Sequence, residues 1–124
     1  VRIGLFPGWG GTQRLAQLVG QGAASKLVLT GAPVSGEEAE RIGLVNSAVP
    51  EEDLWTLAYA TAEEVLQGGP HAVAAAKRAI RQAYETTLST GLRFETEAWL
   101  VNFQSPDRLQ GLSAFLNRES PPWT

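Results

Sequence analysis

The residues best suited to chemistry lie in a glycine-rich segment near the N-terminus, residues 4 to 15, which reads GLFPGWGGTQRL. Its closely spaced glycines, Gly8, Gly10 and Gly11, permit steep backbone turns and let a ligand approach the main-chain amides. The segment leads into an expected helix, whose first N–H groups have no intrahelical partner. Such a loop suits an anion, a carbonyl oxygen or a water molecule.

The spacing of these glycines excludes two nucleotide-binding signatures. The G-x-G-x-x-G pattern of a dinucleotide site is absent, and no Gly-Lys-Ser/Thr follows as in a P-loop. On its glycines alone, the segment fits equally well a tight loop that serves only helix packing.

The other polar residues are weaker candidates. Carboxylates paired at helical spacing are typical of a solvated helix surface; they are Glu37, Glu38, Glu63, Glu64, Glu95 and Glu97. His71 stands beside Pro70 with no catalytic partner in view, so we expect it at the surface. Lys77, Arg78 and Arg81 are likewise expected on a solvated face rather than at a phosphate site.

Composition limits the class of protein. A chain of 124 residues, 44% hydrophobic and 19% charged, is at most one ordinary globular domain. Its net charge of -3 does not indicate a basic surface for binding nucleic acid or acidic lipid. Without cysteine and with one histidine, no metal site is expected. No apolar run could span a bilayer and no signal peptide is visible, so an intracellular compartment is the expectation.

Helical periodicity dominates the elements that must position the glycine segment. Brief helices are expected over 11–19, 21–29 and 35–42, the last opened by a capping box of Ser35 and Glu38. Amphipathic helices are expected over about 54–66, 73–84, 92–103 and 109–116. Gly43 to Val49 (GLVNSAV) is the one strand candidate, and it would need a partner to be stable. The expected fold class is mostly α, with about six or seven helices and one short strand.

The complete string G-x-x-P-G-x-G-G-T-Q-R-L resembles the segment that follows the second catalytic glutamate of enoyl-CoA hydratases. Further matches follow in the family's order: VLTG at 28–31, Ser35, Glu38-Ala39, GLVN at 43–46, Lys77, Asp107-Arg108, Gly111 and Ala114-Phe115. Over nearly its whole length, the chain therefore resembles the C-terminal half of an enoyl-CoA hydratase/isomerase of the crotonase family.

The resemblance implies a fold and an assembly. Residues 1–50 would end the α/β crotonase core, a ββα-superhelix, with the glycine-rich pocket loop, short helices and one strand. Residues 51–124 would form a helical region for oligomerisation and coenzyme A (CoA) contact, in a homotrimer or dimer of trimers. The chain starts at Val1 and contains no methionine, which we interpret as a sign of a cleaved or partial chain.

The resemblance also implies an activity, the addition of water to a 2-enoyl-CoA by two glutamates and two oxyanion-binding amides. All four groups would precede this region, with the second glutamate directly before Val1, so the chain alone is expected to be inactive. Its partners would be an acyl-CoA substrate and its own N-terminal half, with no permanently bound cofactor. The location would be cytoplasmic, or the mitochondrial matrix in a eukaryote.

Site residues carry over by position. The backbone N–H of Gly8 would help to hold the catalytic water, and Phe6, Pro7 and Trp9 would border the acyl pocket. Trp9 stands where a small residue is frequent, which leaves acyl-chain preference open. On the last helix, Phe115 and Arg118 match positions that meet CoA adenine and phosphates, usually at the site of a neighbouring subunit; Arg118 stands where lysine is common.

Two other readings stay open. The apolar faces of residues 92–103 and 109–116 would also suit a non-catalytic helical module for oligomerisation, in which Trp99, Phe103 and Phe115 are core or interface residues. Other crotonase activities, including enoyl-CoA isomerase, acyl-CoA hydrolase and decarboxylase, share the scaffold.

Overall fold

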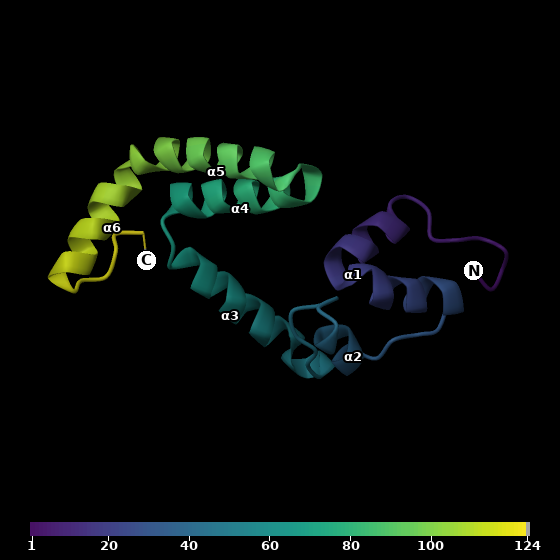
Figure 1. Ribbon diagram of the computed structural model, residues 1–124. Helices are drawn as coiled ribbons and strands as arrows, with labels where there is room; N and C mark the ends of the chain where they lie inside the picture. The colour runs from purple at the N-terminus through teal and green to yellow at the C-terminus, as the bar shows by residue number, and fades with distance from the viewer. Residues whose placement is uncertain (124) are drawn as a thin grey trace. The chain divides into compact units, whose positions relative to one another are not determined.

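The computed structural model describes residues 1 to 123, and these are mostly helical (Figure 1). The elements in chain order are α1 (Gly11–Thr30), α2 (Gly36–Arg41), a 3-10 turn η1 (Glu51–Asp53), α3 (Leu54–Leu66), α4 (Pro70–Glu85), α5 (Leu88–Phe103) and α6 (Pro106–Asn117). The chain divides into two compact units, unit 1 (Val1–Leu54) and unit 2, which starts at Trp55. The mostly helical class is confirmed, while the division of roles after residue 50 stays a prediction.

Helix α1 consists of two helical stretches that meet at Gly20, as the sequence indicated. Gly20 has φ 79° and ψ 159°, which interrupts the helix with a kink. The second stretch ends at Gly31 (φ 60°), whose N–H donates to the carbonyl of Leu27. The Arg2 Nε donates to the Thr30 carbonyl over 3.1 Å, so the N-terminal segment is tied to the end of α1.

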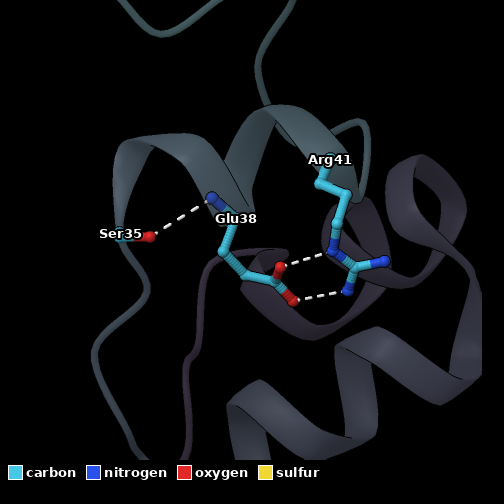
Figure 2. A network of polar contacts seen from close by, with 3 residues as sticks. All are labelled: Ser35, Glu38 and Arg41. Carbon is cyan, nitrogen blue, oxygen red and sulfur yellow. Dashed lines mark hydrogen bonds and ion pairs between the residues drawn. The ribbon is translucent and has the colours of Figure 1, made fainter.

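The short helix α2 is stabilised at its start by Ser35, whose hydroxyl accepts from the Glu38 N–H at 3.2 Å (Figure 2). The second hydrogen bond of the predicted capping box, from the Ser35 N–H to the Glu38 side chain, does not form. The Glu38 carboxylate instead accepts two hydrogen bonds from the Arg41 guanidinium, at 2.6 and 2.7 Å. That hydrogen bonding lowers the pKa of Glu38 below its ordinary value.

The prediction of a strand over residues 43–49 is wrong, because the structure has no strand there. After α2 the chain turns at Gly43 (φ 75°), and the Gly43 and Leu44 N–H groups donate to the carbonyls of Glu40 and Ala39. The Ala48 N–H donates to the Glu40 carboxylate at 3.0 Å. These backbone groups are thus satisfied by α2, and no second strand is present within residues 1–123 to offer a ladder.

In unit 2, α4 and α5 lie side by side and run in opposite directions (Figure 1). Thr87 begins α5 by accepting from the Thr90 N–H. Near its end, the rings of Trp99 and Phe103 stack with centroids 4.9 Å apart, and the Arg108 guanidinium lies 4.0 Å from the Phe103 centroid. This stack connects the end of α5 to the first turn of α6.

Burial is slight within the described residues. The buried apolar residues are all alanines, namely Ala24, Ala39, Ala75 and Ala114. Large side chains such as Trp55, Ile80 and Leu116 are exposed by 64% or more. Because alanine burial contributes little hydrophobic free energy, the burial seen within the described residues adds little to stability. No helix among residues 1–123 has the length and apolar character required to cross a membrane.

Candidate active-site loop and CoA-contacting helix

The glycine segment forms a tight turn immediately before α1. The Gly11 N–H donates to the Gly8 carbonyl over 2.9 Å, and the two residues between them both have left-handed backbone angles. These are Trp9 (φ 49°) and Gly10 (φ 84°). A left-handed conformation is strained for a bulky side chain, so the turn must be held by other contacts.

Arg14, one helical turn into α1, supplies such a contact. Its Nη2 donates to the Trp9 carbonyl, and its guanidinium lies against Gly10. A Cβ at Gly10 would meet the Arg14 Cζ at 3.3 Å, and a Cβ at Gly11 would meet the Pro7 Cβ at 2.8 Å. The glycines therefore allow Arg14 and Pro7 to close around the turn, which the glycine spacing did not reveal.

Gly8 stands at the open side of this turn. It is exposed, a Cβ there would meet nothing within 4 Å, and its N–H donates no hydrogen bond within residues 1–123. The adjoining apolar side chains, Phe6 and Trp9, are 71% and 98% exposed. The turn thus offers uncommitted main-chain donors, the Gly8 N–H among them, beside accessible apolar groups. Such an arrangement can hold a water or carbonyl oxygen next to a hydrocarbon chain.

The predicted CoA-contacting residues lie together at the C-terminal end of α6. Phe115 is 78% exposed, and Arg118 is an exposed residue that ends the helix in a left-handed conformation (φ 57°). The Glu119 N–H donates to the Ala114 carbonyl at 2.9 Å, which closes the helix end. A cation and an aromatic ring are therefore both accessible here, as recognition of a phosphate and a purine would require.

The structure also contains a pair that the sequence analysis missed. His71, at the start of α4, uses both its backbone N–H and its ring Nδ1 to bond the carboxylate of Asp107 on α6, at 2.7 and 2.8 Å. We predicted a surface histidine without a catalytic partner, and its side chain is indeed 62% exposed. The available signal was Gly69-Pro70, which offers no capping side chain for α4.

A hollow of about 420 Å³ lies beside the C-terminal end of α6 and is lined in part by Glu119. Two further hollows lie away from the predicted site residues. One, of about 430 Å³ between α4 and α5, is lined mostly by alanines together with Ile80 and Trp99. Another in unit 1, of about 460 Å³, lies between α1 and α2 and includes Lys26 and Glu38. Within residues 1–123, no three histidine or carboxylate side chains are grouped as metal ligands would be. Neither hollow contains an arrangement of groups suited to catalysis.

Comparison with known proteins identifies the family. The family model described as enoyl-CoA hydratase/isomerase matches residues 1–124, so the chain belongs to this family. It is 41% identical over 99% of its length to a probable mitochondrial enoyl-CoA hydratase of Dictyostelium discoideum, and 40% identical over its whole length to the probable enoyl-CoA hydratase echA8 of Mycobacterium tuberculosis.

The structural comparison agrees. The chain matches the crystal structure of enoyl-CoA hydratase from Bacillus anthracis with a TM-score of 0.93 and 40% identity over 98% of its length. The fold is therefore that of the C-terminal part of a crotonase-type enzyme. The chain spans about half the length of its relatives, 44% and 48% of the two hydratases and 47% of the Bacillus protein.

Proposed function

We propose that this chain is the C-terminal part of an enoyl-CoA hydratase that adds water, with syn stereochemistry, to a 2-enoyl-CoA of fatty-acid or related acyl-CoA metabolism. The observation that carries the proposal is the exposed Gly8 N–H, uncommitted within residues 1–123, in the turn held by Arg14. Membership of the enoyl-CoA hydratase/isomerase family supports the reaction class.

In the proposed mechanism, two glutamates of the N-terminal half activate the water, and main-chain amides there stabilise the thioester oxyanion. The Gly8 N–H donates to the same water and fixes its position beside the double bond. Phe6, Pro7 and Trp9 border the acyl chain. Because Trp9 is large and 98% exposed, it is the residue of this segment best placed to limit acyl-chain length.

Unit 2 has a different role in the proposal. Phe115 and Arg118 receive the adenine and phosphates of CoA bound by a neighbouring subunit, in a homotrimer or dimer of trimers. Residues 1–50 complete the acyl pocket and 51–124 serve assembly and CoA contact, in an enzyme of the cytoplasm or mitochondrial matrix. The substrate is the CoA thioester, and no further cofactor takes part.

The test is to incubate the full-length protein with crotonyl-CoA and identify the products by mass spectrometry. We expect 3-hydroxybutyryl-CoA, heavier than the substrate by one water. Release of free CoA would indicate a hydrolase. With 3-enoyl-CoA, a shift of the double bond without mass change would indicate an isomerase. An inert full-length protein with an intact assembly would instead favour a non-catalytic oligomerisation module.

The turn itself can be tested with Gly10→Ala in the full-length protein. The substitution places an alanine at a backbone φ of 84°, which is strained for a residue with a side chain. Its Cβ would also meet the Arg14 guanidinium at 3.3 Å. A displaced Gly8 N–H should lower kcat by roughly tenfold to a hundredfold, because misplacement by about 1 Å has effects of that size. The measurement is steady-state hydration of crotonyl-CoA.

Gly22→Ala is the matched control for this variant. Gly22 lies inside α1, and a Cβ there meets nothing within 4 Å. The change should leave kcat as it was and stabilise the helix by about 0.5–1 kcal/mol. Equal kcat losses in both variants would show that the turn has no special role.

A further inference from the structure

The N-terminus of α4 has an unusual arrangement of donors. Gly69 precedes the helix and has no side chain to cap it, and Pro70 occupies the first turn without an N–H. The next N–H groups, of His71 and Ala72, therefore need an acceptor from elsewhere.

Asp107 of α6 supplies that acceptor. Its Oδ2 accepts from the His71 N–H at 2.7 Å, and its Oδ1 lies 2.8 Å from the His71 ring Nδ1. A Cβ on Gly69 would approach Oδ2 to 2.7 Å, so only glycine leaves room for the carboxylate. The start of α4 is thus capped by a residue 36 positions later in the chain.

The charge of Asp107 is stabilised where it lies. The residue is only 9% exposed. Burial raises the pKa of its carboxyl group, but the hydrogen bonds from His71 and the nearby Ala72 backbone amide lower it by more, so the pKa falls below its ordinary value. The positive end of the α4 dipole favours the same charged form. Asp107 therefore remains an ionised acceptor at neutral pH.

We propose that Asp107 is a positioning residue that fixes the direction of α6 and so places Phe115 and Arg118 for the adenosine diphosphate part of CoA. The inference rests on the proposed function of α6. Asp107 lies in the first turn of α6 and Arg118 at its end. Eleven residues of helix span roughly 16 Å, so a tilt of about 10° at Asp107 moves Arg118 by about 3 Å. Such a shift exceeds what a phosphate hydrogen bond tolerates.

Two other side-chain contacts hold α6, and within residues 1–123 neither joins it to α4 by a hydrogen bond. The Arg108 guanidinium rests on the face of Phe103, a contact without directional hydrogen bonds. Trp123 packs against Gly111 and donates to the Gln67 carbonyl at 3.0 Å, but it belongs to the segment that follows α6. The carboxylate of Asp107, with two hydrogen bonds from His71 of α4, is the directional link between the two helices.

The test compares two substrates in the full-length enzyme, crotonyl-CoA and crotonyl-pantetheine, which lacks the adenosine diphosphate part. The measured quantity is the ratio of kcat/KM for the first to kcat/KM for the second. Arg118→Ala should lower this ratio by roughly tenfold or more, since charge-assisted contacts to phosphate are strong. Asp107→Ala should lower it by a similar factor, while kcat for crotonyl-pantetheine stays within about twofold of the parent.

Further variants separate positioning from mere stability. Asp107→Asn keeps one acceptor oxygen, should preserve folding, and should lower the ratio by an intermediate factor. The double variant of Asp107 and Arg118 should be no worse than Arg118→Ala, because both act through the same contact. Glu97→Ala, which removes an exposed acid of α5, is the control and should leave the ratio unchanged.

The outcomes distinguish the two proposals. If Arg118→Ala lowers the ratio while Asp107→Asn and Asp107→Ala leave it at the parent value, the positioning role is overturned and the CoA contact stands. An equal fall in activity on both substrates in the Asp107 variants would likewise overturn it, since it indicates a general structural defect. If Arg118→Ala leaves the ratio unchanged, the proposed CoA contact of α6 is refuted, and the positioning role of Asp107 that rests on it is refuted with it.

Discussion

The 124-residue chain alone should leave crotonyl-CoA unhydrated, and joining it to an N-terminal half with both glutamates should restore hydration. General acid–base groups contribute about 10²–10⁴-fold and oxyanion donors about 10²–10³-fold, and in the proposed enzyme these groups belong to the other half. The paired carboxylates of this chain do not replace them. Glu63 and Glu64 are adjacent and exposed on α3, as expected for a solvated helix surface.

The experiment uses a chimera of this chain with the N-terminal half of the Bacillus anthracis enzyme, whose matched region is 40% identical. Activity should appear in the chimera and disappear when either glutamate of the donor half is replaced by glutamine. The isolated chain should also bind a hydrophobic dye and self-associate, because within residues 1–123 the buried apolar residues are all alanines and many large apolar side chains are exposed. Hydration by the pure isolated chain above the uncatalysed rate would refute the prediction.

The second large effect is expected from Arg118→Ala in the full-length enzyme. An exposed arginine at the end of α6 that pairs with a CoA phosphate contributes binding in ground and transition states alike. Its removal should raise KM for crotonyl-CoA by roughly tenfold or more and change kcat little. Steady-state kinetics over a range of substrate concentrations checks this.

Two variants control the Arg118 result. Arg118→Lys keeps a positive charge and should recover most of the lost affinity. Arg93→Ala removes another exposed arginine, on α5, and should leave KM unchanged. A loss of kcat with unchanged KM in Arg118→Ala would place this residue outside substrate binding.

Local signals predicted the helices well and long-range pairing poorly. The glycine at position 20 predicted a break, and the Ser35 hydroxyl caps α2 as its position indicated. Residues 43–49 carry an apolar pattern typical of a strand, but strand formation needs a second strand. The N–H groups of Gly43, Leu44 and Ala48 donate to α2 instead. Glu38 pairs with Arg41 because a guanidinium fork is a stronger donor to a carboxylate than one backbone amide.

In the candidate site too, local features were predictable from the sequence and contacts between distant residues were not. Glycine spacing predicted a tight turn with available amides, and Gly8 has one. The return of Arg14 to the Trp9 carbonyl depends on a side-chain rotamer that spacing does not specify. His71 and Asp107 are 36 residues apart, and no local pattern relates them. A glycine and a proline at the start of α4 were the only hint that its cap must come from another helix.

The most direct test of the account is a crystal structure of the full-length protein with butyryl-CoA, a saturated thioester that cannot be hydrated. We predict that the Gly8 N–H lies within about 3.2 Å of a water held between two glutamates, with the acyl chain against Phe6, Pro7 and Trp9. An acyl chain bound away from this turn, with the Gly8 N–H committed to another protein group, would contradict the central claim.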